Sequence, residues 1–403
     1  YCSCRDDWDC PEYSHCTSGR CEGTGRSPHC FLPPTGFASL LPEDEPGFPW
    51  GGHDADGYTG TTANSALVHG SPVRSRDAAG HPFPRHAQVT STPVVANLND
   101  DNGDGLINEL DLPELIFTSF CDTNYFNHGV LRAVHGGGAN AGKELFARCG
   151  EKLWNEGDAI VDGEGAPLPA ADCPCNGGDF EPTGAPAVGD LDGDGIPEIV
   201  VTAHAAGVGS SEVSNTRVMI LNRRGEIISD KVVPALAGGN PAVTLANVDA
   251  QGLAEIIVGA RVFLLEAQAG VLTIVRDLVG QESQGTNNNQ GAVSCVADLD
   301  DDGRMEVVAG GTAYKVPAPP SGACPSELSG LNPEHMAYCT NTLQVMWNAE
   351  GVEGFCAIAD VLAEREKAED PEPLAGAGAP LDGVPEVVLI GDGTLRIYNG
   401  QTG

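Results

Sequence analysis

Short apolar runs, separated by acidic or glycine-rich turns, follow one another along the chain from about residue 90 onward. The runs VVANL, AVGDL and SCVADL are each followed by an acidic turn and then by a second apolar run. Apolar runs of about four to eight residues between such turns predict β-strands. Helical periodicity is nearly absent, so we expect an all-β chain with one short helix at Val361–Glu369.

The unit of strand, acidic loop and strand occurs five times. The copies begin at Thr92, Ala185, Pro241, Ala292 and Cys356. An outer hairpin is expected in the second copy, around a turn at Arg223–Gly225, and one more strand follows the last copy. Repeats of this kind predict the blades of a β-propeller, with insertions where the spacing is longer.

A propeller has to close, and the chain ends soon after its last predicted strand. We expect either that residues 72–83 complete the final blade or that the sequence is part of a longer protein. The predicted organisation is a disulfide-rich module at residues 1–30, a linker that could supply a closing strand at residues 31–89, and a propeller of four-stranded blades at residues 90–403.

The cysteines indicate an oxidising compartment. Of 14 cysteines, six lie in the first 30 residues, and the segment CRDDWDCPEYSHCTSGRC resembles the Cys-rich repeats of secreted bacterial proteins. The alternative, a zinc knuckle, lacks the usual Cys-x-x-Cys and His spacing. Among the dispersed cysteines we expect the pairs Cys324–Cys339 and Cys295–Cys356.

The start of the chain and its hydropathy also indicate an exported protein. The chain opens at Tyr1, as a mature product does after removal of a signal peptide. No uncharged apolar stretch is long enough to form a transmembrane segment. We therefore expect an exported bacterial protein, secreted or held at the cell surface.

The charge restricts the class of partner. The chain has 21 Lys and Arg against 57 Asp and Glu, which gives a formal net charge of −36. Nucleic acid and anionic lipid are bound through basic surfaces, so neither is an expected partner. The expected partners are neutral, cationic or bridged by a metal ion.

Part of this acidity is concentrated in the loops. In the second copy, alternate positions carry Asp190, Asp192 and Asp194, followed by the carbonyl of Ile196 and the carboxylate of Glu198. Calcium prefers six to eight oxygen ligands, and alternate residues of a tight turn can direct their oxygens to one point. The spacing therefore predicts a calcium site.

This loop, placed between two strands and repeated, resembles the FG-GAP repeat of integrin-α-like propellers, also called VCBS-like. The resemblance covers about residues 90–403 and implies further calcium ligands in other copies. In the fourth copy these are Asp298, Asp300, Asp302, the Arg304 carbonyl and Glu306. In the fifth copy they are Asp360, Asp382, the Val384 carbonyl and Glu386, interrupted by an insertion at residues 361–379. The third copy departs from the pattern, with Asn247, Asp249, Gln251 and Glu255, so calcium is doubtful there.

The first copy is longer than the others. Its loop also resembles the 12-residue EF-type loop in its dockerin form. The EF-type ligands are Asp100, Asn102, Asp104, the Leu106 carbonyl, Asn108 and Asp111, and the FG-GAP positions beside them are Asn97, Asn99 and Glu114. We expect one or two Ca²⁺ here, and four to five in the whole chain.

No catalytic residue and no organic cofactor are expected. The ten histidines show no zinc-enzyme spacing, and no Gly-x-Ser-x-Gly elbow occurs. The segment HGGGAN at His135 is interpreted as a glycine-rich hairpin loop. The family resemblance implies a non-catalytic extracellular module for adhesion, surface assembly or fibre formation, whose partner is an extracellular protein, a neutral glycan or another copy of itself.

Two alternatives remain open. A lectin-like binder of neutral glycans needs exposed aromatic side chains, for which Trp50, Trp154 and Trp347 are the candidates. A polysaccharide lyase-like enzyme on a propeller scaffold would need a basic or carboxylate-rich cleft, and the scarcity of lysine argues against it.

Overall fold

The computed structural model describes residues 14–17, 20–23, 83, 86, 88–120, 129–150, 152–158, 180–204, 215–234, 241–268, 271–287, 291–361 and 383–403. The chain divides into two units, Tyr1–Glu45 and Pro46–Gly403. In the first unit, β1 (Ser14–Thr17) and β2 (Arg20–Gly23) form an antiparallel hairpin. The disulfides predicted for this unit and the strand predicted at residues 72–83, Phe83 excepted, lie outside the described residues.

The second unit is all-β, and its described residues form five antiparallel sheets, in each of which the strand order follows the chain. The first sheet holds β3 (Val94–Ala96), β4 (Glu114–Ser119), β5 (Val130–His135), β6 (Glu144–Cys149) and β7 (Lys152–Asn155). The second holds β8 (Ala187–Gly189), β9 (Glu198–His204), β10 (Asn215–Leu221) and β11 (Ile227–Pro234). The third holds β12 (Thr244–Ala246), β13 (Glu255–Ile257), β14 (Arg261–Gln268) and β15 (Val271–Val279). The fourth holds β16 (Ser294–Ala297), β17 (Glu306–Ala309), β18 (Thr312–Lys315) and β19 (Gln344–Asn348), and the fifth holds β20 (Phe355–Ala359), β21 (Glu386–Gly391) and β22 (Thr394–Asn399).

Two short helical elements complete the described structure, η3 (Gly138–Asn140) and α2 (Pro333–Cys339). The start of α2 follows from its sequence, because the Asn332 side chain accepts a hydrogen bond from the backbone N–H of His335 and Pro333 occupies the first turn. Neither element was predicted. The helix expected at Val361–Glu369 lies outside the described residues beyond Val361, and no described helix is long and apolar enough to cross a membrane.

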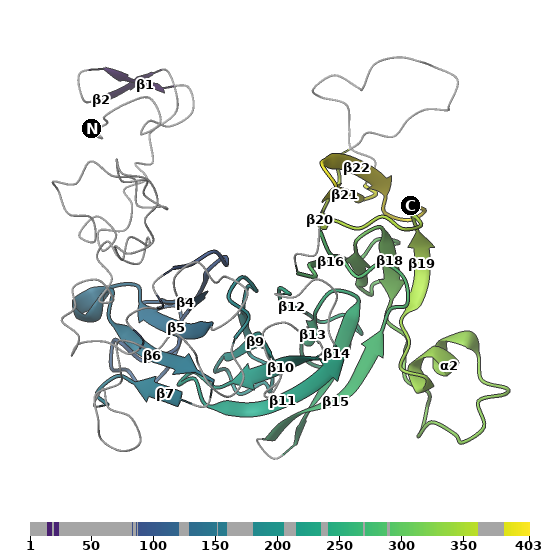
Figure 1. Ribbon diagram of the computed structural model, residues 1–403, viewed down its shortest axis with the longest axis horizontal. Coiled ribbons are helices and arrows are strands. Elements are labelled where there is room, and N and C mark those ends of the chain that lie inside the picture. The colour runs from purple at the N-terminus through teal and green to yellow at the C-terminus, as the bar shows by residue number, and fades with distance from the viewer. Residues whose placement is uncertain are drawn as a thin grey trace. The chain divides into compact units, whose positions relative to one another are not determined.

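The first strands of the sheets, β3, β8, β12, β16 and β20, contact one another in this order. Strands β12, β16 and β20 of this series are labelled in Figure 1. A disulfide between Cys295 and Cys356 joins β16 to β20, and a second one joins Cys324 to Cys339 at the end of α2. Both predicted pairings are confirmed. The described strands do not form a closed ring, and only the three middle sheets have four strands.

Apolar side chains pack between consecutive sheets. Strand β9 shows how, since Ile199 and Val201 join the cluster shared with the first sheet, whereas Val200 joins the cluster shared with the third. Successive side chains of a strand point to opposite faces, so the apolar run from Ile199 to Val201 is buried on both sides. Four such clusters separate the five sheets.

The outer hairpin predicted in the second copy is confirmed as β10 and β11, with the turn between them closed by a hydrogen bond from Gly225 N–H to the Asn222 carbonyl. The strand predicted near the end of the chain is confirmed as β22.

Candidate metal centres

A buried glutamate begins the second strand of each of the five sheets of the second unit. In each case its Oε2 accepts a hydrogen bond of 2.8–2.9 Å from a backbone N–H at the start of the acidic loop. The five donor–acceptor pairs are Leu98–Glu114, Leu191–Glu198, Val248–Glu255, Leu299–Glu306 and Val361–Glu386. All five glutamates are at most 6% exposed, so the bond holds each loop against its sheet.

The strand register explains why this contact forms. Each glutamate lies opposite a small residue, Ala or Gly, at the end of the first strand. Directly opposite residues of antiparallel strands have neighbouring side chains, and a small partner leaves room for the glutamate to turn over the loop. The apolar residue that donates the N–H enters the cluster between two sheets in the first four copies, as Leu98, Leu191, Val248 and Leu299.

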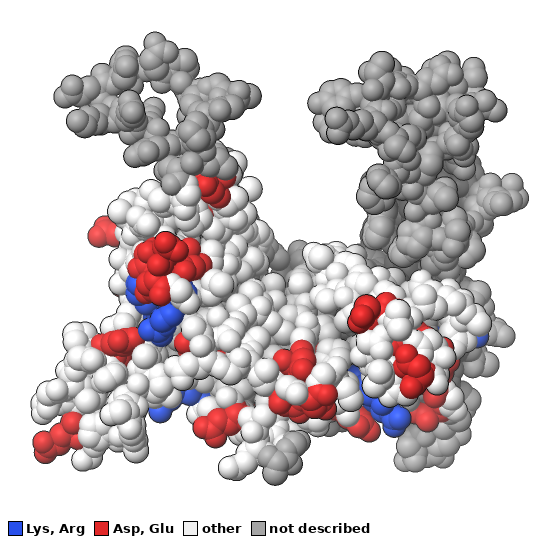
Figure 2. All heavy atoms as spheres, turned by 180° about the vertical axis from the view of Figure 1, so that it is seen from behind, with Lys and Arg blue, Asp and Glu red and all other residues white. Residues whose placement is uncertain are grey.

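The loops hold part of the acidic charge of the chain. Figure 2 shows acidic side chains in separate groups on one face, with few basic side chains among them. In the second loop, carboxylate oxygens of Asp190, Asp192 and Asp194 lie within 4.8 Å of one another. Burial raises the pKa of Glu198 to about 7, and the charges of Asp192 and Asp194 add to the rise. A cation at this point would offset the mutual repulsion of these carboxylates.

The turn of this loop is built by backbone bonds to the first aspartate. Asp190 Oδ1 accepts from Gly193 N–H at 2.7 Å, and its Oδ2 accepts from Gly195 N–H at 2.9 Å. Gly195 has a φ of 85°, a conformation that a residue with a Cβ rarely adopts. Three of the residues predicted as ligands of the second site, Asp190, Asp192 and Asp194, therefore lie together, whereas the Ile196 carbonyl and Glu198 remain predicted ligands.

The fourth loop has the same arrangement, with carboxylate oxygens of Asp298, Asp300 and Asp302 within 4.8 Å of one another. Here the Nζ of Lys315 reaches into the group and contacts Asp300, Asp302 at 2.8 Å and Glu306 at 3.8 Å. Burial opposes the charge of Lys315, but its contacts with Asp300 and Asp302 raise its pKa. The ammonium group thus lies where a metal ion would bind.

In the first loop, Asp100 Oδ1 and Oδ2 accept from the N–H groups of Gly103 and Gly105, at 2.7 and 2.8 Å, which repeats the turn around Asp190. Asp111 is buried and accepts from the Asn108 N–H at 2.9 Å, so it ties the end of the EF-type loop. Although all three are described, Asp100, Asp104 and Asp111 do not come together in one metal-sized group.

The fifth and third loops differ from these. In the fifth, Gly383 N–H donates to Asp360 Oδ2 at 3.0 Å, so the long insertion leaves the contact between Asp360 and the second half of the loop intact. Asp382 lies outside the described residues. In the third loop, the Asn247 amide donates to the Gly252 carbonyl at 3.1 Å. A neutral hydrogen bond therefore closes the loop in which calcium was doubtful.

Buried oxygens without a partner support cation binding by the loops. Four such atoms are the Oδ1 atoms of Asn97, Asn99, Asp300 and Asp360. An unpaired buried acceptor costs free energy, and all four stand at positions where the repeat pattern predicts a ligand oxygen. The donor set, which is nearly all oxygen, fits Ca²⁺.

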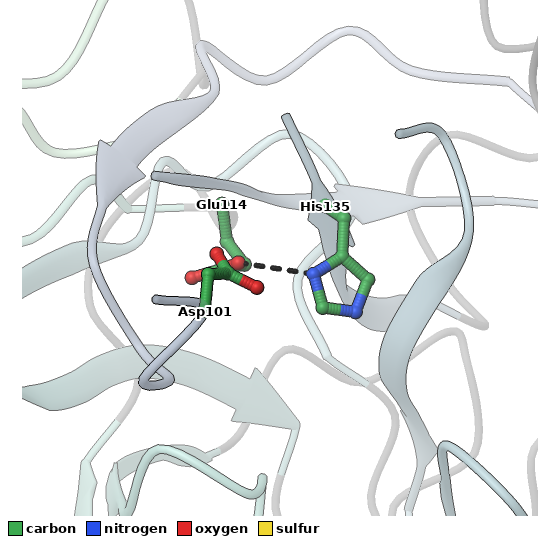
Figure 3. A group of neighbouring side chains, drawn as sticks. All are labelled: Asp101, Glu114 and His135. Atoms are coloured by element: carbon green, nitrogen blue, oxygen red, sulfur yellow. Dashed lines mark hydrogen bonds and ion pairs between the residues drawn. The ribbon is translucent and has the colours of Figure 1, made fainter. Parts of the chain in front are cut away.

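Sequence reasoning missed two residues of this candidate site, Asp101 in the first loop and His135 at the end of β5. Asp101, Glu114 and His135 can each direct one ligand atom into a space where these atoms lie within 4.8 Å of one another (Figure 3). Counting alternate positions from Asn97 would have found Asp101. His135, whose hydrogen bond with Glu114 raises its pKa, comes from another strand, and no local motif could have found it.

The third loop gives a pH prediction. Burial raises the pKa of Glu255 to about 7, from an ordinary value of 4.5. The folded state therefore binds this proton more tightly than the unfolded chain, so the stability contribution of protonated Glu255 is full below about pH 4.5 and is lost as the pH rises through 7.

The variant Glu255→Gln tests this prediction. Its amide oxygen can still accept a hydrogen bond from Val248 N–H, and the loss of stability with rising pH should disappear. Denaturant unfolding at pH 5 and pH 8 measures this. The free energy of unfolding of the variant, relative to that of the wild type, should rise between these pH values by up to about 1.4 kcal/mol per pH unit. A variant that is weaker at pH 8 than at pH 5, relative to the wild type, would contradict this.

Lys315→Met should strengthen calcium binding at the fourth loop. The substitution removes the ammonium charge from among three carboxylates and keeps the length of the side chain. We expect a gain of roughly tenfold in affinity, since a unit charge at about 4 Å is worth 1 kcal/mol even in water. Calcium titration by calorimetry measures this, with the exposed Lys152→Met as the matched control. Equal affinities in the two variants would show that Lys315 does not compete with the ion.

Two clefts and two tryptophans among the described residues bear on the glycan-binding and catalytic alternatives. Two clefts, of about 530 and 480 Å³, lie beside the first and second loops and share Arg223, Arg224 and Glu226. Neither is lined by an aromatic residue. Trp347 is buried and donates its indole N–H to the Gly400 carbonyl at 2.7 Å, so it cannot serve as a sugar-stacking residue, and Trp154 is half-buried. Trp50 lies outside the described residues.

Similar proteins are found among solved structures but not among curated sequences. The chain has no match among curated protein sequences. Among solved structures it is similar to the V. cholerae biofilm matrix protein Bap1, with 22% identity and a TM-score of 0.48 over 80% of this chain and 40% of that one. It is also similar to rhamnogalacturonan lyase YesW, with 14% identity and a TM-score of 0.43 over 77% and 49% of the two chains. The Pseudomonas aeruginosa PilY1 C-terminal domain follows, with 14% identity and a TM-score of 0.30 over 62% and 50%.

The chain thus spans half or less of the length of these three proteins. A family model for the FG-GAP repeat matches residues 183–218, which include β8, β9 and the loop between them. Residues 183–218 are therefore an FG-GAP repeat, as the loop from Asp190 to Glu198 predicts.

Proposed function

We propose that the chain is an exported, calcium-stabilised β-propeller segment that acts as a non-catalytic module in extracellular adhesion or surface assembly. One observation carries the proposal, namely the bond from a buried glutamate to the start of the acidic loop, repeated in all five sheets. This hydrogen bond places each candidate ion close to the apolar contacts between sheets, where a bound ion would stabilise the scaffold.

The role of calcium follows from this placement. An ion bound by Asp190, Asp192, Asp194 and Glu198 would hold the backbone of Leu191, whose side chain is buried between the second and third sheets. Binding to the folded state alone stabilises that state by mass action. Equivalent ions in the fourth and fifth loops would act at those copies, and the third loop needs none.

The propeller geometry is supported by the order of the sheets. Their first strands lie side by side in chain order and their faces pack through four apolar clusters. Propeller blades have this relation, with the first strand of each blade nearest the axis.

Export is supported by the two described disulfides, because such bonds persist in oxidising compartments. The high negative charge keeps the chain soluble and directs it toward neutral or calcium-bridged partners, such as another protein, a neutral glycan or a second copy.

Cells that display the chain on their surface test the proposal. We expect them to aggregate or attach in millimolar calcium and to be released by a chelator, and the double variant Asp192→Ala with Asp194→Ala should attach less. Equal attachment of the variant and the wild type would refute the role of calcium in adhesion. Inhibition by dextran would favour the lectin alternative, and release of unsaturated uronate from rhamnogalacturonan would favour the lyase alternative.

A further inference from the structure

We propose that Asp101, Glu114 and His135 form a mixed oxygen and nitrogen site for a divalent transition-metal ion of the zinc class. The inference deepens the proposed function, because it rests on the first loop being a cation site, but it assigns that loop a different ion from the other loops. The proposed site does not require calcium at the EF-type ligands from Asp100 to Asp111.

The strand register builds the site. Glu114 begins β4 and lies opposite Ala96 of β3 on one side and opposite His135 of β5 on the other. Three neighbouring strands therefore place a loop start, a carboxylate and an imidazole in one row. Side chains directly opposite each other in antiparallel strands are near neighbours, so Glu114 and His135 have to meet.

The distances fit one shared ion. His135 Nδ1 lies 3.2 Å from Glu114 Oε1, and ligand atoms from Asp101, Glu114 and His135 all lie within 4.8 Å of one another (Figure 3). Ligands of one zinc ion, each about 2.0–2.2 Å from the metal, have separations in this range. Glu114 and His135 are almost fully buried, whereas Asp101 is exposed and closes the site from the solvent side.

Each inner ligand is held by a further contact. Glu114 Oε2 accepts from Leu98 N–H at 2.8 Å, which leaves Oε1 directed toward the imidazole. His135 Nε2 lies 3.4 Å from Glu156 Oε2, on the opposite side of the ring. Metal-binding histidines usually donate their second N–H to a carboxylate in this way, which orients the ring and increases its basicity. The geometry therefore makes Nδ1 the metal ligand and Glu156 a positioning residue.

Two further oxygens lack a partner beside this group. The buried Oδ1 atoms of Asn97 and Asn99 make no hydrogen bond. Asn97 follows Ala96, the strand partner of Glu114, and Asn99 donates its amide to Asp101 Oδ1 at 3.0 Å. Both side chains thus belong to the same neighbourhood. They could complete the coordination of an ion, which would account for buried acceptors that otherwise carry a free-energy cost.

The other sheets show what distinguishes the first. At the third-strand position opposite the buried glutamate, the fifth sheet has Asn399. Extending the printed register by one residue places Leu264 there in the third sheet and Lys315 in the fourth. None of these three residues offers an imidazole. Since imidazole nitrogen suits zinc and related ions while calcium prefers oxygen alone, His135 changes the class of ion that the first loop selects.

The test uses the full, oxidised, tag-free chain loaded with millimolar calcium and titrated with Zn²⁺ in equilibrium dialysis. We expect one zinc ion that calcium does not displace. His135→Ala should abolish this binding, and Asp101→Asn, at an exposed position that does not endanger folding, should weaken it at least tenfold. Glu156→Gln should weaken it about 10–100-fold, as loss of an orienting carboxylate does. The control is His204→Ala, which removes the other described His–Glu pair, with Glu181, and should leave zinc binding unchanged.

X-ray absorption at the zinc edge distinguishes a role of His135 as a metal ligand from a purely structural role, because it reports the atoms bound to zinc. It should report one nitrogen ligand at about 2.0–2.1 Å in the wild type. Displacement of zinc by millimolar calcium, a spectrum without nitrogen, or undiminished zinc binding by His135→Ala and Asp101→Asn would each overturn the proposal. If zinc binds as expected but a chelator selective for calcium leaves the melting temperature unchanged, the zinc site stands and the structural role of calcium fails.

Discussion

Removal of calcium is expected to lower the melting temperature of the chain by about 4 °C for each loop that loses its ion. An ion present at about 100 times its dissociation constant stabilises the folded state by about 2.7 kcal/mol, and an unfolding entropy of about 2.1 cal/mol/K per residue over the unit Pro46–Gly403 converts each kcal/mol into a shift of roughly 1.3 °C. The clustered carboxylates of the second and fourth loops repel one another without a cation, which adds to the effect. Thermal scans in calcium and in chelator measure this.

The contribution of a single loop to this shift in melting temperature can be measured with variants. Asp192→Ala with Asp194→Ala should remove one calcium ion by metal analysis and reduce the shift caused by chelator. Gln251→Ala in the third loop should change neither, because that loop is closed by the Asn247 amide. A melting curve that chelator leaves unchanged would refute the structural role of calcium outright.

Leu191→Ala should destabilise the chain by about 2–5 kcal/mol, the usual cost of emptying a buried leucine site. Leu191 is 1% exposed and packs between the second and third sheets, while its backbone N–H is held by Glu198. The substitution should therefore also weaken calcium binding at the same loop, since the cavity allows the loop to shift. Denaturant unfolding with and without calcium measures both effects.

The fifth loop provides the matched control. Val361 occupies the same position as Leu191, with its N–H bonded to Glu386, but its side chain is 47% exposed because no described sheet packs against it. Val361→Ala should change the stability by no more than about 0.5 kcal/mol. If both variants lost the same stability, the cause would lie in the loop backbone and not in packing between the sheets.

Much of the fold could be predicted because the information is local. Short apolar runs and acidic turns are enough to predict strands, and the second loop was predicted because its ligands lie within nine consecutive residues, Asp190 to Glu198. Both expected disulfides formed, one of them within a single insertion. The fifth strand of the first sheet, β7, and the helix α2 were missed, since they depend on how insertions pack against a finished sheet.

The first loop marks the limit of prediction from sequence. The sequence by itself determined the all-β class and the oxygen-rich loops, because strand pattern and ligand spacing are properties of neighbouring residues. Only the tertiary structure decided which side chain stands opposite each buried glutamate. That choice depends on the pairing of β4 with β5 in one sheet and of β17 with β18 in another, which places His135 beside Glu114 and Lys315 beside Glu306. A shift of one residue in either register would turn these side chains to the opposite face, so the ion that each loop can hold is set by strand pairing.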